Sequence, residues 1–295
     1  MNAAQSHYFT ASDGARLHYL EAKCLKAREL EADSLETNQN NTLLLLPGGG
    51  FSADIFQHQI DVFSQQYRVI SLDKRGHGQS EKVDYGYRVS RFAHDLHDLL
   101  TNLALTNVTI IAHSLGAAMV YNYIDLFGHQ SIKKLIVVDE PAALLINPAW
   151  SDNEKQAYGS IYQAAELHGL TNGFLEEDIS ELCQNIVNAM TTSHATTAQK
   201  DFILSCMAIP GSAACQLYLN NICQDFRDVI KKLTLPVLFI TGRASLHPWQ
   251  SHQWMHDQVP HSELFIFEEQ QGGNHFMMVE NPELFNQVVL DFINR

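Results

Sequence analysis

The stretch TIIAHSLGAAM, residues 109–119, carries the most specific chemical signal in the sequence. An apolar run ends at Ser114, small residues stand two positions away on either side (Ala112 and Gly116), and a helical pattern follows. A tight strand–turn–helix corner needs small flanking residues because it brings the two flanks close together, and it raises the serine Oγ above the sheet. The corner also directs the N–H of Leu115 and the positive end of the new helix at any oxyanion formed there. The pattern predicts a nucleophile at Ser114, although an ordinary buried serine at such a turn has the same local sequence.

A second stretch, LIVVDEPAAL at 135–144, places two carboxylates directly after an apolar run. A charge beside buried backbone is costly unless it is paired. Asp139 and Glu140 therefore either form a solvated turn, or one of them faces a histidine.

Several continuous apolar runs indicate the strands that would position these residues. Such runs are typical of parallel strands buried on both faces, and here they are TLLLLPG, YRVISLD, VTIIAHS, KLIVVDE, PVLFITG and ELFIFEE. Helical patterns separate them at about 53–65, 88–104, 115–127, 248–258 and 281–294. Before them, ARLHYLEA (15–22) alternates like a half-exposed strand, and polar residues 23–41 indicate an insertion or a mobile loop. The alternation of strands and helices predicts an α/β fold with a doubly wound, mostly parallel sheet.

The interval 146–224 interrupts this alternation, because it contains helical patterns without a convincing buried strand. We expect a helical cap here, inserted after the sixth strand between two parts of one core, 1–145 and 225–295. An insertion at this point should lie over the carboxyl ends of the strands, where open α/β sheets bind ligands. Its apolar and aromatic residues, with two from the core, predict either a largely apolar pocket or simply the cap's own core: Tyr158, Tyr162, Phe174, Met190, Phe202, Met207, Tyr218, Trp249 and Phe276.

Taken together, these motifs resemble those of the α/β-hydrolase superfamily over nearly the whole length of the chain. LLLLPGGGFSADIF (43–56) resembles the strand and loop that supply the first oxyanion donor, which puts the N–H of Gly49 in that role beside the N–H of Leu115. VISLDKRGHGQS (69–80) resembles the family's D-x-R-G-x-G-x-S turn, to which we assign a structural role. GGNHFMMVENPELF (272–285) resembles the loop that carries the catalytic histidine, and the resemblance implies that His275 is the base.

The chain departs from the family where most members place the triad acid. That stretch reads FITGRASLHPWQ, with Ser245 at the expected position and no carboxylate from 239 to 250. In some subgroups, such as haloalkane dehalogenases and zearalenone-type lactonases, the acid follows the sixth strand instead, and Asp139 stands at that position. Because adjacent strand residues face opposite sides, only one of the two carboxylates can face His275. We predict Asp139, with Glu140 as the other candidate.

The resemblance implies a serine hydrolase that cleaves a carboxylic ester or lactone of a small, largely apolar substrate through an acyl-enzyme, without a cofactor. Two alternatives stay open. His113-Ser114 together with Asp139 also fits a cofactor-independent, ring-cleaving dioxygenase of the same fold. The absence of the usual acid also fits a ligand-binding relative with little turnover.

Composition excludes other classes. The formal net charge of −14 argues against nucleic acid and anionic membranes as partners. The first residues lack the layout of a signal peptide, and the 5 cysteines form no CxxC, so we expect a reduced, cytoplasmic protein. The 15 histidines show no HExxH spacing, and we expect no metal. We expect a small-molecule substrate as the partner, whereas the oligomeric state has no signature in the sequence.

Overall fold

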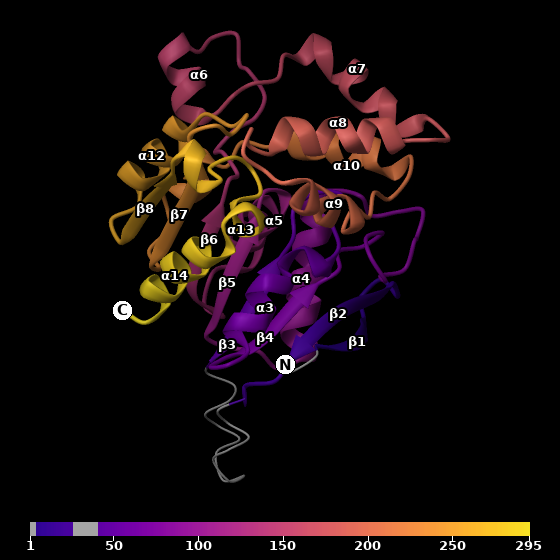
Figure 1. Cartoon of the computed structure of the whole chain (residues 1–295), viewed down its shortest axis with the longest axis vertical. Coiled ribbons are helices and arrows are strands. Elements are labelled where there is room, and N and C mark those ends of the chain that lie inside the picture. Colours follow the sequence, from indigo (N-terminus) through magenta and orange to yellow (C-terminus); the bar gives the residue numbers. More distant parts are fainter. Residues whose placement is uncertain (1–3, 26–40) are drawn as a thin grey trace.

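A single eight-stranded sheet organises the chain in the computed structural model, which describes residues 4–25 and 41–295 (Figure 1). The strand order is β1-β2-β4-β3-β5-β6-β7-β8, and every pair from β4 to β8 is parallel, whereas β2 pairs antiparallel with β1 and β4. The strands are β1 Gln5–Thr10, β2 Arg16–Ala22, β3 Thr42–Leu46, β4 Arg68–Leu72, β5 Val108–His113, β6 Ile132–Val138, β7 Val237–Gly242 and β8 Ser262–Phe267. The predicted α/β class and mostly parallel sheet are confirmed.

Helices cover both faces of this sheet, because successive strand residues point to opposite sides. Leu44 and Leu46 of β3 belong to one buried cluster, which includes residues of α4, α5 and α12, whereas Leu43 and Leu45 belong to the other, with residues of α3, α13 and α14. The helices are η1 Ala53–Phe56, α3 Gln57–Phe63, α4 Val89–Asn102, α5 Leu115–Phe127, α6 Asp152–Tyr158, η2 Ala164–Glu166, α7 Leu167–Asn172, η3 Gly173–Leu175, α8 Ser180–Met190, α9 Thr197–Ser205, α10 Ala213–Ile222, α11 Arg227–Ile230, α12 Trp249–Gln258, η4 Glu269–Gln271, α13 Met277–Glu280 and α14 Pro282–Ile293. None of these described helices is long and apolar enough to cross a membrane.

Two strands differ in burial from the prediction. In β2 the run Leu17–Leu20 is buried throughout, because β2 lies between β1 and β4 in the sheet and the core packs on it. β8 is only half-buried over most of its length, because it forms an edge of the sheet. Of the polar stretch 23–41, residues 26–40 lie outside the described residues.

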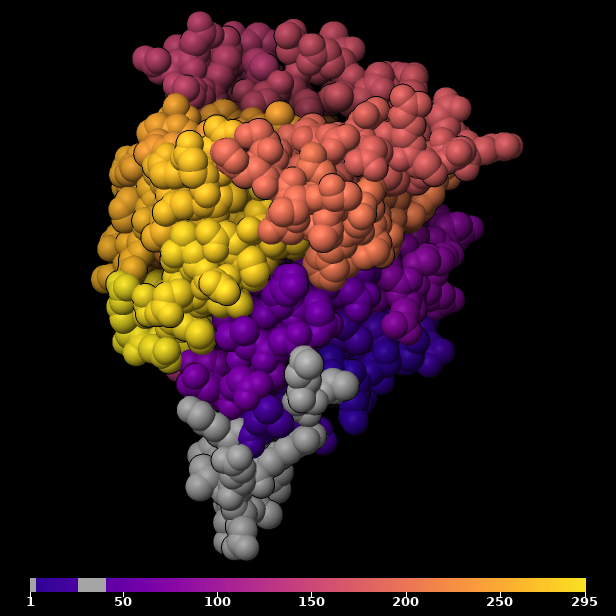
Figure 2. Space-filling model, viewed as in Figure 1, coloured from indigo at the N-terminus to yellow at the C-terminus, as the bar shows by residue number. Residues whose placement is uncertain are grey.

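Residues 146–224, all of which the structure describes, contain α6 to α10 and contribute no strand to the sheet. Figure 1 shows these helices together at one end of the sheet, and Figure 2 shows the same residues, magenta to salmon, covering that end of the molecule. A helical cap inserted after the sixth strand is therefore present.

The turn after β4 has the structural role assigned to it. Asp73 accepts hydrogen bonds from the backbone N–H of Ala53 at 2.6 Å and of Gln79 at 2.8 Å, and its carboxylate lies 2.7 Å from the ring of His18. These bonds tie the β4 turn to β2 and to the loop that follows β3. The turn thus fixes the loop on which Gly49 stands.

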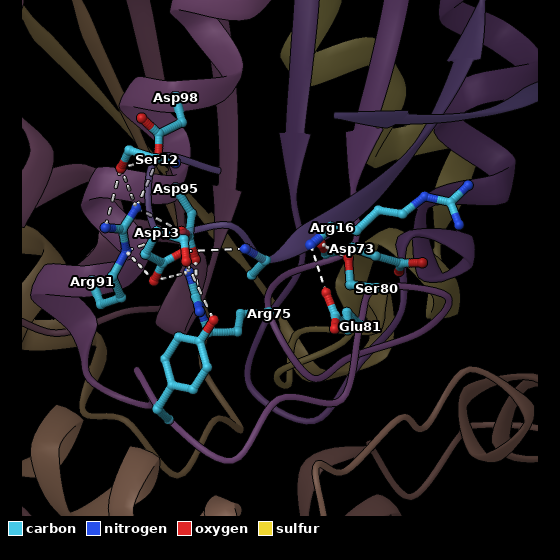
Figure 3. Close-up of polar contacts among 12 residues, drawn as sticks. Ser12, Asp13, Arg16, Asp73, Arg75, Ser80, Glu81, Arg91, Asp95 and Asp98 are labelled. Carbon is cyan, nitrogen blue, oxygen red and sulfur yellow. Dashed lines mark hydrogen bonds and ion pairs between the residues drawn. The ribbon is translucent and has the colours of Figure 1, made fainter. Parts of the chain in front are cut away.

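Arg75, in the same turn, holds the sheet to α4 (Figure 3). Its guanidinium is fully buried and donates to Asp95 at 2.8 Å and to Asp13 at 2.9 Å. Arg91 also contacts Asp95, at 2.9 Å, so the buried carboxylate has two cations. Burial makes an unpaired charge costly, and this network therefore stabilises the turn as long as all its members are present.

Candidate active site

Ser114 occupies the strand–turn–helix corner that the sequence predicts. β5 ends at His113 and α5 begins at Leu115, so the serine is the one residue between them, and its backbone has φ 51° and ψ −129°. A positive φ in a residue with a side chain is strained and persists only where packing enforces it. A Cβ at Gly116 would lie 2.3 Å from the carbonyl oxygen of Leu46. This close approach explains why the residue two positions after the serine is a glycine.

The structure brings His275 and Asp139 together. The Nδ1 atom of His275 lies 2.6 Å from Oδ2 of Asp139, and both side chains are buried. His275 stands just before α13, and its backbone oxygen accepts a bond from Nε2 of His113 at 3.0 Å. His275 and Ser114 line the same pocket. In the described chain no hydrogen bond joins Ser114 Oγ to the His275 ring, as is common where no substrate is bound.

Three further side chains surround Asp139 that the sequence analysis missed. Ser245 donates to Oδ2 at 2.6 Å and Thr241 donates to Oδ1 at 2.8 Å. Nδ1 of His247 lies 2.9 Å from the backbone oxygen of Asp139 and 3.5 Å from Oδ2. Burial alone would raise the pKa of Asp139, but the bonds from His247 and His275 hold this pKa well below its usual range. Asp139 is therefore a carboxylate at neutral pH. Ser245, at the position where the sequence resemblance predicts the acid, donates a hydrogen bond to it.

Asp139 and Glu140 are both buried, at 0% and 1% exposure, so the solvated turn is excluded. The strand-alternation argument does not apply to them, because β6 ends at Val138 and Asp139 has a φ of 52°. This left-handed residue turns the chain after the strand. Asp139 then faces His275, whereas the Glu140 carboxyl contacts the Ser114 hydroxyl and accepts from Asn221 Nδ2 at 3.3 Å.

Gly49 and Leu115, the predicted oxyanion donors, both line the pocket beside Ser114. No hydrogen bond among the described residues uses the N–H of either. The loop of Gly49 is held from below by Lys74, which donates to the oxygen of Gly48 at 2.8 Å and of Phe51 at 3.2 Å. Burial lowers the pKa of Lys74 to about 7, so this lysine acts mainly as a hydrogen-bond donor to the loop.

The pKa values of the two histidines at Asp139 shift in opposite directions. Burial lowers the pKa of His275 despite its bond to Asp139, which favours the neutral ring that can accept a proton. Burial by itself would also lower the pKa of His247, but Asp139 and Glu140 have the larger effect and raise the pKa of that ring. One atom from each of Asp139, His247 and His275 lies within 4.8 Å of the others, the one such cluster in the described ranges that could hold a metal ion. His275 already bonds to the Asp139 carboxylate and His247 to the Asp139 backbone oxygen, so these polar groups have partners without a metal.

The pocket above Ser114 has a volume of about 250 Å³ and is mostly apolar. It lies between the β3 and β5 loops and the cap. Its lining consists of Gly49, Phe51, Ser114, Leu115, Tyr162, Leu170, Thr171, Phe174, Leu182, Ile186, Met190, Met207, Tyr218, Asn221, Ile222 and His275. Of the aromatic and apolar residues predicted for it, Tyr162, Phe174, Met190, Met207 and Tyr218 line the pocket. Tyr158, Phe202, Trp249 and Phe276 do not and pack elsewhere.

Comparison with known proteins defines the class. Residues 43–288 match the model of a family described as the alpha/beta hydrolase family, and the chain therefore belongs to that family. The chain is 27% identical to the non-heme chloroperoxidase CPO-A1 of Kitasatospora aureofaciens over 87% of its length and 94% of that protein. It is 24% identical to 3-oxoadipate enol-lactonase 2 of Acinetobacter baylyi, over 81% of this chain and 84% of that one. Among solved structures, an esterase from Exiguobacterium antarcticum has the same fold, with a TM-score of 0.83 at 20% identity over 99% of this chain and 100% of that one. The chain is an enzyme of the α/β-hydrolase type.

Proposed function

We propose that this enzyme hydrolyses carboxylic esters or lactones of small, largely apolar substrates through an acyl-enzyme on Ser114. The observation that carries the proposal is the 2.6 Å contact between His275 and Asp139 in the pocket that contains Ser114. The similarity to an enol-lactonase and the fold shared with an esterase support the same type of bond as the target.

In this mechanism Ser114 attacks the substrate carbonyl while His275 takes the hydroxyl proton. Asp139 fixes the ring so that Nδ1 carries a proton and Nε2 accepts one, and its charge stabilises the imidazolium that forms. The N–H groups of Gly49 and Leu115 bind the tetrahedral oxyanion, aided by the positive end of α5. His275 then protonates the leaving alcohol, and a water activated by the same ring releases the acid.

The pocket supports the substrate class. A volume of about 250 Å³ lined mostly by aliphatic and aromatic side chains favours a small acyl group without charge. A cationic or strongly polar acyl group would lose its hydration there with little compensation.

Purified protein should be assayed against p-nitrophenyl esters of acetate, butyrate, hexanoate and decanoate, together with γ-lactones. We expect turnover to be highest for the short and medium chains and to fall for decanoate, because the cavity fills. Ser114→Ala should abolish turnover while its thermal melt stays that of the wild type. The proposal fails if the wild type cleaves none of these substrates, or if Ser114→Ala cleaves them as well as the wild type does.

A further inference from the structure

Glu140 is a buried carboxyl beside the nucleophile that the mechanism above does not use. Its side chain is 1% exposed, and it takes part in none of the ion pairs formed by the described residues. Two polar groups reach it, the hydroxyl of Ser114 and the Nδ2 atom of Asn221 at 3.3 Å. A buried carboxylate that forms no ion pair is costly, so burial favours the uncharged acid here.

The protonation state of this carboxyl decides which hydrogen bonds Ser114 can make. An uncharged carboxyl has an O–H that can donate to the serine oxygen, which leaves the hydroxyl proton of Ser114 for His275. A carboxylate only accepts hydrogen bonds, so Ser114 must then donate its proton to Glu140. In that arrangement the base has no proton to remove, and a negative charge lies close to the forming oxyanion.

We propose that Glu140 is a second carboxyl of the active site, which permits attack by Ser114 when uncharged and suppresses it when ionised. The inference rests on the proposed role of Ser114 as nucleophile and extends it to the regulation of that residue by pH.

The groups around Glu140 set the pH at which its carboxyl ionises. Burial raises the pKa of Glu140 to about 7, with Asp139 adding to the rise and with His247, Asn221 and Ser114 opposing it. Two phenols also face it, those of Tyr121 and Tyr162, and burial raises the pKa of both, so neither supplies charge. The rate of serine attack should therefore fall above neutral pH. If His275 alone controlled this rate, it would not change there, because the ring is already neutral.

The test is the rate at which a fluorophosphonate probe labels the protein between pH 6 and 9, because this reaction reports attack by the serine without ester turnover. In the wild type the rate should fall about tenfold per pH unit once Glu140 is ionised. The labelling rate of Glu140→Gln should not change with pH up to pH 9, because an amide donates to Ser114 but cannot ionise. Glu280→Gln is the matched control, since Glu280 is a half-buried glutamate bonded to Thr192, and it should show the wild-type profile.

A second variant keeps Glu140 and changes its surroundings. Asn221→Leu removes a bond that lowers the pKa of Glu140, so the alkaline fall should move to higher pH. The inference is overturned if wild-type labelling does not fall above pH 7, or if Glu140→Gln shows the same fall. It is also overturned if Asn221→Leu leaves the midpoint unchanged, which decides the matter should Glu140→Gln not fold. Absence of labelling at every pH would instead refute the nucleophile itself, and with it the proposed function.

Discussion

Replacing Asp139 by asparagine separates the charge of the acid from its shape. The carboxylate accepts from His275 and Ser245 at Oδ2 and from Thr241 at Oδ1. An asparagine can keep its oxygen toward His275, because the hydroxyl of Thr241 can rotate to accept from the new amide nitrogen. The tautomer of His275 then survives and only the charge is lost. In the opposite orientation the amide nitrogen faces His275 and the wrong tautomer results.

The two orientations bracket the expected effect. Two unit charges about 4 Å apart at an effective dielectric constant of about 20 attract by about 4 kcal/mol, which corresponds to about 10³ in rate. An inverted tautomer costs about 10⁴ in serine proteases. We therefore expect kcat for Asp139→Asn to fall by about 10³ to 10⁴. KM should change little, because Asp139 lies behind His275 and does not line the pocket.

The assay is the initial rate of p-nitrophenyl butyrate cleavage at pH 6.5, with thermal melting to verify the fold. Asp257→Asn is the matched control, because Asp257 is exposed on α12 and does not line the pocket, and its rate should equal that of the wild type. A rate for Asp139→Asn within tenfold of the wild type would refute the reasoning that this carboxylate supports the base.

The pH profile, Gly116 and Arg75 each allow a further test. The acid side of the kcat/KM profile should have its midpoint below 6.5, because burial lowers the pKa of His275 from that value and activity is lost only as the pH falls through the lowered pKa; a midpoint above 6.5 in the rate profile would contradict this assignment. Gly116→Ala should destabilise the fold by about 1–3 kcal/mol in urea unfolding, because its Cβ would lie 2.3 Å from a backbone oxygen, whereas Gly169→Ala, with nothing within 4 Å, should cost nothing; equal stabilities would show that the corner can relax. Arg75→Met should lower the free energy of unfolding by about 3–5 kcal/mol in the same measurement, because it leaves a buried carboxylate with one cation fewer. Arg295→Met, which removes an exposed ion pair, should lower it by under about 1 kcal/mol. A decrease for Arg75→Met as small as that for Arg295→Met would contradict the role of the network.

The parallel strands were predictable because each is a run of apolar residues too short for a buried helix. The corner at Ser114 was predictable for a related reason, since the small residues required by a close backbone approach stand at fixed spacing in the sequence. Asp139 followed from the missing carboxylate around Ser245, combined with a resemblance to subgroups that place the acid after strand six.

The environment of Asp139 was not predictable in the same way. Thr241, Ser245 and His247 lie in the stretch that lacks a carboxylate, and the signal in the sequence is that their side chains can donate hydrogen bonds to one. The left-handed backbone at Asp139 leaves no mark in the sequence, because aspartate is also common in ordinary turns. Because of this backbone conformation, the Asp139 side chain points to His275 and the Glu140 side chain to Ser114. In an extended strand the two side chains would point to opposite faces of the sheet.

The clustering of Arg75 with Asp13 and Asp95 also lay beyond sequence reasoning. The three residues come from different segments, and only the packing of α4 against the sheet brings their charges together. The motif around Arg75 suggested a structural role, but not its partners.

We propose that Ser114 is the nucleophile, that His275 removes its proton, and that Asp139 orients and stabilises the His275 ring. The most direct measurement is to map the site modified by a fluorophosphonate at pH 6.5 by peptide mass spectrometry. We predict a single adduct on Ser114 in the wild type, and in Asp139→Asn this adduct should form more slowly by about 10³-fold or more. An adduct on another residue, or labelling of Asp139→Asn at the wild-type rate, would contradict it.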